Sequence, residues 1–511
     1  MQTIAVRLLI ALPWLISFNF GPSTTRGVEL LTLACGMMLM IVALAHSPFP
    51  LAKSTASAWL LAGTLSCAMA LVQYLGWSAH FSPFISATLP GEAFANLRQR
   101  NLFATLTSIA LAALLWWSLQ LRPERSRRRS LVCTGMAALA VLLAVGNAAS
   151  SSRTGLFQVV LVCALTALWR GFRVSLTRRL LAVYVLAYAI ALLVLPTLIG
   201  LNPLALGAWA RLQAGDALCS GRSTLWHNVL DLIAQKPWLG WGWGELDYAH
   251  YVTLFPGERF CAILDNAHNL PLHLAVELGV PFAVCFCLAL LWLTRRARPW
   301  AEVDATRQMA WCVLAVIALH SLLEYPLWYG PFQMAVVLCG VLLWITPERS
   351  LMCRNPVFES NRQLVQSGCA IAAIIFIVFV GYASWDYYRI SQIYLSPHER
   401  SAAYRDDTLR KIKGSRLFQA QVEFAELAIT PLTPDNAREQ YRMATALLHF
   451  SPEPLVIERV IASAGLLGMD AEVAFHRARY QAAFPEVYLA WQARPQNSPT
   501  SPRASPAASH P

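Results

Sequence analysis

His268 is the residue whose type and position best suit chemistry in this sequence. It stands in the segment Asp265-Asn266-Ala267-His268-Asn269, which ends a long polar stretch just before an apolar run of membrane-spanning length. An imidazole titrates near neutral pH, so it can take up a proton where water meets lipid. The alternative is that His268 and Asn269 only cap the following helix, because asparagine and similar residues are common at helix starts.

Four arginines are predicted to lie on the same side of the membrane as this histidine. They are Arg98, Arg100, Arg153 and Arg222. A guanidinium group is a rigid fork that binds phosphate oxygens in pairs and stays charged. Several such groups beside one histidine suit a diphosphate leaving group and a nearby proton transfer. Each arginine taken alone could instead anchor a lipid headgroup, which is also a phosphate contact.

A second set of ionisable residues lies within apolar runs. His320 and Glu324 are four residues apart, so they share one helix face. Ionisable residues inside a span are costly and usually functional. We expect both, with Asn269, to support the site; the alternative is a buried pair that only holds two helices together. His273 and Glu277 have the same spacing and the same two interpretations.

The composition is that of a polytopic membrane protein. The 511 residues are 57% hydrophobic and 13% charged, whereas soluble domains carry roughly a quarter charged residues. We therefore predict an all-α membrane fold. The net charge of +12 would suggest nucleic acid in a soluble protein. Here the arginines fall in short clusters between apolar runs, a pattern that sets membrane orientation, and no aromatic-interleaved basic strip accompanies them, so we exclude nucleic-acid binding.

About eleven apolar runs approach the length of roughly 20 residues that a membrane helix needs. They are residues 4–20, 27–46, 55–76, 102–121, 130–148, 156–172, 180–199, 269–294, 308–325, 330–347 and 366–384. Another apolar run follows the first almost at once, and no small-residue cleavage site precedes a soluble chain. We therefore interpret residues 4–20 as a span rather than a signal peptide.

The connections between these runs alternate in charge. Those after the fourth, sixth, eighth and tenth runs are rich in arginine, so they face the cytoplasm by the positive-inside rule. The amino terminus is then cytoplasmic. The connections expected outside are residues 77–101, 149–155, 200–268 and 326–329 and the chain after about 385.

The sequence predicts five regions. They are an N-terminal membrane bundle (1–199), an external loop with active-site residues (200–268), C-terminal membrane helices (269–384), an external helical tail (385–493) and a disordered end (494–511). The tail has the helix pairs of tetratricopeptide-type hairpins without a full repeat signature. We expect it to bind or pack rather than to carry chemistry.

Twelve cysteines occur, of which only Cys219 and Cys261 lie in the long polar loop. They form the natural disulfide pair if that loop faces an oxidising compartment; the alternative is two free thiols. No cysteine pair has zinc-site spacing, and no P-loop, GxGxxG or HExxH motif occurs. We therefore expect no metal and no cofactor.

Several of these segments together resemble the O-antigen ligase and polymerase superfamily. They are Ser152-Arg153-Thr154-Gly155, Asn266-Ala267-His268-Asn269 after a long external loop, and Glu277-Leu278-Gly279. The segments Leu97–Ala104 and His320–Tyr329 are more similar to bacterial protein O-oligosaccharyltransferases of the PglL type, as is the extended tail.

The resemblance implies an enzyme of the bacterial inner membrane that works on its periplasmic face. It would move a preassembled glycan from undecaprenyl diphosphate to an acceptor hydroxyl, without nucleotide or metal. His268 would be base or hydrogen-bond partner, Arg153 and Arg222 would hold the diphosphate, and Arg98 and Arg100 would help form that pocket.

The acceptor that we expect is a serine or threonine of a periplasmic or pilin-like protein. One alternative is a ligase that joins O-antigen to lipid A-core. Another is a polymerase or a transporter of lipid-linked glycan. For a transporter we would expect an inverted repeat, and we find none.

Overall fold

The computed structural model describes residues 2–16, 22, 25–45, 50–121, 127–200, 219, 221–346 and 362–494. Across these ranges the secondary structure is helical, as predicted, and none of the described residues lies in a strand. The chain divides into two compact units. The first takes in the described parts of residues 1–19, 23–214 and 293–382, and the second those of 20–22, 215–292 and 383–511.

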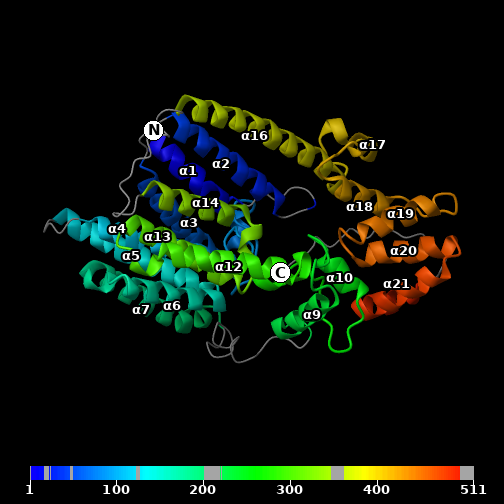
Figure 1. Ribbon diagram of the computed structural model, residues 1–511, viewed down its shortest axis with the longest axis horizontal. Coiled ribbons are helices and arrows are strands. Elements are labelled where there is room, and N and C mark those ends of the chain that lie inside the picture. Colours follow the sequence, from blue (N-terminus) through cyan, green and yellow to red (C-terminus); the bar gives the residue numbers. More distant parts are fainter. Residues whose placement is uncertain are drawn as a thin grey trace. The chain divides into compact units, whose positions relative to one another are not determined.

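The first unit is a helical bundle with one buried helix (Figure 1). That helix is α4, Arg100–Gln120, whose residues 102–116 are all buried. It packs against several others of the bundle, and its buried face includes polar residues such as Thr105 and Ser108. The remaining helices are α1 (Gln2–Leu15), α2 (Arg26–Ala45), α3 (Leu51–Tyr74), α5 (Arg127–Ala149), α6 (Arg153–Leu168), α7 (Ser175–Leu198), α13 (Ala305–Ser321) and α14 (Gly330–Ile345).

Small residues let α3 approach its neighbours closely. A Cβ atom added to Gly63 on α3 would overlap the side chain of Ala110 on α4. One added to Gly146 on α5 would overlap the side chain of Cys67 on α3. Close approach at small residues is typical of helices that pack within a membrane. It holds α3, α4 and α5 together at this level.

Six helices of the described ranges are long and apolar enough to cross a membrane. They contain residues Leu51–Tyr74, Arg100–Gln120, Arg127–Ala149, Ser175–Leu198, Val280–Ala301 and Ile371–Tyr394. Shorter apolar helices are Thr3–Leu15, Arg153–Leu168 and Gly330–Ile345. A helical membrane protein is thus confirmed, whereas the count of eleven spans stays a prediction.

The second unit joins the polar loop to the tail. Its loop helices are α9 (Arg222–Gln235), α10 (Leu246–Val252) and α11 (Leu270–Leu278). Its tail helices are α17 (Thr408–Ile412), α18 (Gln419–Ile429), α19 (Ala437–Leu447), α20 (Pro454–Leu466), α21 (Asp470–Ala483) and α22 (Pro485–Gln492). Two helices, α12 (Val280–Ala297) and α16 (Arg362–Ser391), have residues in both units.

Successive tail helices from α18 to α21 pack side by side (Figure 1). Their relation to tetratricopeptide repeats stays a prediction. Of the segment 494–511 that we expect to be disordered, residues 495–511 lie outside the described residues, as do 201–218 of the loop.

The predicted span 269–294 is wrong as a single helix. The structure divides it at Gly279, which has a φ of 89° and separates α11 from α12. This left-handed conformation favours glycine and ends α11. Pro281 then lies in the first turn of α12, where its missing N–H costs nothing. The predicted span rests on apolar length, which does not show this break, although glycine and then proline follow the last turn of α11.

Candidate active site

The connection that carries Arg98 is fixed to the first unit by the buried side chain of Gln73 on α3. Its Oε1 accepts hydrogen bonds from the backbone N–H groups of Phe94 and Ala95, at 3.0 and 2.7 Å. Its Nε2 donates to the carbonyls of Ser86 and Ala95, at 2.9 and 2.8 Å. One amide thus satisfies four backbone groups, and the connection is a fixed platform before α4.

Arg98 and Arg100 lie where this platform meets the start of α4. Arg98 has a φ of 59°, a strained conformation for a residue with a side chain. Burial lowers the pKa of its guanidinium, yet an arginine remains charged at neutral pH. The guanidinium of Arg100 lies 3.8 Å from the carboxylate of Glu92. Both arginines lie at the N terminus of α4, where the helix dipole also favours an anion.

Glu324, three residues beyond the end of α13, ties the start of α4 in place. Its carboxylate accepts hydrogen bonds from Gln99 Nε2 at 3.3 Å and from Asn101 Nδ2 at 3.1 Å. Asn101 Oδ1 in turn accepts a hydrogen bond from Ser152 Oγ at 2.6 Å, just before α6. Three segments far apart in the sequence thus meet in one polar network.

One turn deeper, the fully buried His320 extends this network. Its Nδ1 lies 2.8 Å from Thr105 Oγ1 on α4, and Gln158 Nε2 on α6 donates to the same hydroxyl at 2.8 Å. The spacing of four residues between His320 and Glu324 matches the spacing between their partners on α4, Thr105 and Asn101. This register places His320 and Glu324 against one face of α4.

Arg153 is the first residue of α6. Ser152 caps this helix, since its Oγ accepts a hydrogen bond from Gly155 N at 3.1 Å. A Cβ atom added to Gly155 would overlap Asn147 on α5 and lie 2.9 Å from Ala104 on α4. The turn that carries Arg153 is therefore packed tightly against two helices. The first unit thus holds three of the predicted arginines, Arg98, Arg100 and Arg153, on rigid backbone.

The second unit holds Arg222, the first residue of α9. The expected disulfide between Cys219 and Cys261 is present, with the Cα atoms 5.3 Å apart. It joins the chain just before α9 to the segment that leads to His268. Asn228 on α9 binds that segment too, because its Oδ1 accepts a hydrogen bond from Phe260 N at 2.8 Å.

His268 stands on a turn that its neighbours fix on both sides. Its own φ is 50°, and its N–H donates to the Oδ1 of the buried Asn266 at 2.9 Å. The carbonyl of Ala267 accepts a hydrogen bond from Trp226 Nε1 on α9 at 3.0 Å. Asn269 caps α11 by accepting the N–H three residues on. Asn269 is thus the cap of α11, and His268 stands before it on backbone of positive φ.

Behind this turn, His273 and Glu277 form the buried pair expected from their spacing. His273 Nε2 lies 3.4 Å from Glu277 Oε2, and both side chains are 2% exposed. Burial, with a smaller contribution from His268, lowers the pKa of His273 to about 4. Burial raises the pKa of Glu277 to about 7. His273 is therefore uncharged at neutral pH.

The glycine- and tryptophan-rich stretch 237–244 closes the end of α11. Trp241 N donates to the carbonyl of Val276 at 2.9 Å, and Gly242 N donates to that of Glu277 at 3.0 Å. The last carbonyls of a helix lack partners within it, so this stretch supplies them. It is a backbone cap and not a phosphate-binding loop.

Gly240 lies in close contact with the end of α11, so its replacement should destabilise the protein. Its φ is 70°, and an added Cβ atom would overlap the carbonyl of Glu277. We expect Gly240→Ala to cost roughly 1–3 kcal/mol, measured by thermal unfolding of the purified protein. Gly257→Ala is the matched control, because nothing lies within 4 Å of its Cβ position. Equal stability of the two variants would contradict the prediction.

The tail contacts α10 within the second unit. Tyr251 OH lies 2.8 Å from His476 Nδ1 on α21. The ring of Tyr248 stacks on that of His449 with centroids 3.7 Å apart, and His449 Nδ1 lies 2.6 Å from Glu245 Oε2. The packing role expected of the tail is thus present in the structure, and its partner is the loop.

The buried Asp247 on α10 gives this unit a predicted pH dependence. Burial, with the nearby carboxylates of Asp265 and Glu245, raises its pKa to about 8. A carboxyl group whose folded-state pKa is raised stabilises the fold below its unfolded pKa of about 3.9, and this stabilisation is lost as pH rises through 8.

We therefore expect Asp247→Asn to unfold at a higher temperature than the parent at pH 8.5 and to show a smaller gain at pH 5. Thermal melts of the whole protein at both pH values measure this. The exposed Asp435, changed to asparagine, is the control. An identical pH dependence of parent and Asp247→Asn would contradict the argument.

The sequence did not point to the buried polar partners of His320, which are Thr105 and, through its hydroxyl, Gln158. A signal existed for the first, because Asn101 and Thr105 have the same spacing as Glu324 and His320. Within the described ranges, His, Cys, Asp and Glu side chains form no cluster of three that could hold a metal ion.

The apolar helices define a multi-pass membrane protein. Family comparison matches three successive segments: residues 93–117 to "Protein glycosylation ligase", 138–287 to "O-Antigen ligase", and 308–498 to "Virulence factor membrane-bound polymerase, C-terminal". The chain belongs to the O-antigen ligase superfamily and is PglL-like within it.

Two curated relatives come from Acinetobacter baylyi. The chain is 28% identical to a "General O-oligosaccharyltransferase" over 159 residues, 30% of this chain and 27% of that protein. It is 26% identical to a "ComP-specific O-oligosaccharyltransferase" over 294 residues, 57% of this chain and 51% of that protein. The chain thus spans about half the length of one relative and about a quarter of the other.

Proposed function

We propose that this protein is a membrane glycosyltransferase that moves a preassembled oligosaccharide from undecaprenyl diphosphate to an acceptor hydroxyl. The acceptor is a serine or threonine of a periplasmic or pilin-type protein. The observation that most supports this is the strained, fixed turn of His268 in a chain whose curated relatives are named O-oligosaccharyltransferases. The active site faces the periplasm from the inner membrane.

In this proposal His268 acts as the general base. It accepts the proton of the acceptor hydroxyl while that oxygen attacks the anomeric carbon of the glycan. The bond from that carbon to the diphosphate oxygen breaks, and undecaprenyl diphosphate leaves with the electron pair. A positioned base contributes most when its pKa lies near the working pH. His273 behind it is uncharged at neutral pH, because burial lowers its pKa to about 4.

The arginines act on the leaving group. Arg153 and Arg222 bind the diphosphate oxygens, and Arg98 and Arg100 help to form the pocket. Charge builds up on the departing oxygen, and donors that are already in place stabilise it without reorganisation. The polar network of Glu324, Asn101 and Ser152 supports this role, since it fixes the two turns on which Arg98, Arg100 and Arg153 stand.

A second candidate function is ligation of O-antigen to lipid A-core. The match of residues 138–287 to the O-antigen ligase family favours it. Both functions use the same donor chemistry and differ only in the acceptor. The match of residues 93–117 to the protein glycosylation ligase family makes protein the preferred acceptor.

Deletion of the gene distinguishes the two. We expect periplasmic glycoproteins to lose their glycan, seen as a shift in gel mobility, while lipopolysaccharide keeps its ladder. Complementation with the intact gene restores the shift. Loss of the lipopolysaccharide ladder with unchanged glycoproteins would select the ligase, and no change in either would refute the proposed transferase.

A further inference from the structure

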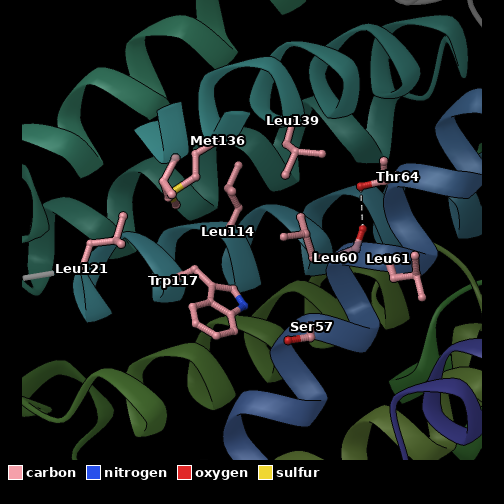
Figure 2. A pocket seen from close by; sticks show the side chains of 10 residues that line it. Ser57, Leu60, Leu61, Thr64, Leu114, Trp117, Leu121, Met136 and Leu139 are labelled. Carbon is pink, nitrogen blue, oxygen red and sulfur yellow. Dashed lines mark hydrogen bonds between the residues drawn. The ribbon is translucent and has the colours of Figure 1, made fainter. Parts of the chain in front are cut away.

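The first unit contains a cavity remote from the arginines at the start of α4. It has a volume of about 420 Å³ and lies among α3, α4 and α5 (Figure 2). Its lining is almost wholly apolar. The lining residues are Ser57, Leu60, Leu61, Thr64, Leu114, Trp117, Leu121, Val132, Met136 and Leu139.

The cavity begins where the close packing of these helices ends. Gly63, Ala110 and Leu143 meet at one level and bring the three helices together. All lining residues but Thr64, the immediate neighbour of Gly63, lie beyond that level, toward the first residues of α3 and α5 and the last residues of α4. The helices therefore enclose a groove that is closed at one end by small residues.

The two hydroxyl groups in the lining do not call for a polar ligand. Thr64 Oγ1 donates to the carbonyl of Leu60 at 2.6 Å, the bond drawn in Figure 2. Ser57 Oγ donates to the carbonyl of Lys53 at 2.7 Å. Both hydroxyls are thus satisfied within α3. A cavity with few polar partners does not hold ordered water well, so hydrocarbon is the ligand that suits it.

Cations flank the other end of the groove. Lys53 precedes Ser57 by four residues on α3, and Arg128 precedes Val132 by four residues on α5. Residues four apart share a helix face, so each cation lies one turn beyond a lining residue and on the same face. Both side chains are exposed. Cations at the end of a hydrocarbon groove match an anionic headgroup attached to an acyl chain.

We propose that this groove binds one anionic phospholipid of the membrane. One acyl chain occupies the space among α3, α4 and α5, and the phosphate lies against Lys53 and Arg128. The lipid fills the gap that the splayed helices leave beside α4, the helix whose first turn carries Arg100. The site is independent of the proposed glycan transfer.

Native mass spectrometry of the whole protein, released from its own membranes in mild detergent, tests this. We expect one retained phospholipid with an anionic headgroup. The double variant Lys53→Gln/Arg128→Gln should retain it about tenfold less, because each cation near the surface adds to the attraction for anionic lipid. Arg178→Gln/Arg179→Gln is the matched control, with exposed cations at the start of α7 and away from the groove. It should retain the lipid like the parent.

A second variant tests the hydrocarbon part. Leu139→Trp fills the groove and should expel the lipid while both cations remain. Equal retention in the parent and the double variant would overturn the proposal. So would a neutral phospholipid, or a polyprenyl phosphate, as the retained species. If Leu139→Trp does not fold, the double variant and its control still decide.

Discussion

Replacement of His268 by alanine is expected to reduce glycan transfer by about two to four orders of magnitude, the usual contribution of a positioned general base. The acceptor hydroxyl then has no group to take its proton, while the donor can still bind. Transfer from purified lipid-linked oligosaccharide to an acceptor protein measures this as kcat, with KM for the donor nearly unchanged. The neighbouring Asn269 still caps α11, so the variant should unfold at the same temperature as the parent.

His398→Ala is the matched control. This histidine is exposed on the tail and lies apart from the loop of His268 in the sequence. It should transfer glycan at the parental rate. Full activity of His268→Ala at normal expression would refute the assignment of the base, whereas equal loss in both variants would point to a general effect of altering histidines.

Removal of the Arg153 side chain is expected to reduce kcat by about 10²–10³, the usual effect of losing one donor to a developing negative charge. Arg153→Lys keeps the charge but loses the planar fork that binds two oxygens at once. It should therefore recover only part of the rate. The Ser152 cap and the packing of Gly155 do not involve the guanidinium, so stability should hardly change.

Arg178→Ala provides the comparison for this series, because it removes an exposed cation at the start of another helix of the same unit. We expect it to be as active as the parent. If Arg153→Ala transferred glycan as fast as Arg178→Ala, Arg153 would not bind the leaving group. If Arg153→Lys were fully active, charge alone and not the fork would be what matters there.

Most of the helices could be predicted because apolar runs of membrane length have few other folds open to them. The prediction of one span misses the break at Gly279, although Glu277 and Pro281 flank it in the sequence. What ends α11 is the stretch 237–244, more than thirty residues earlier in the chain, whose N–H groups bind its last carbonyls. Contacts between distant segments leave no trace in the hydropathy of either.

The candidate site, too, could be predicted only in part from the sequence. The chemistry of His268 and Arg153 follows from their residue types and positions, so the sequence alone nominates them. The polar side chains that surround the site do not stand out in this way. Thr105 and Gln158 are ordinary helix residues until α13 places His320 against Thr105. Likewise, Asn266 becomes important only because its side chain accepts the N–H of His268.

The central claim is that guanidinium groups and the imidazole act together on one substrate at the outer face of the membrane. Cysteine cross-linking in intact cells tests it most directly. Ser151→Cys places a thiol two residues before Arg153, and Ser223→Cys places one directly after Arg222 in the loop of His268. Each single variant serves as the control. We predict that a short membrane-impermeant bismaleimide joins the two cysteines in the double variant and blocks transfer. Labelling of either cysteine only after the membrane is permeabilised, or labelling of both without a cross-link, would contradict the account.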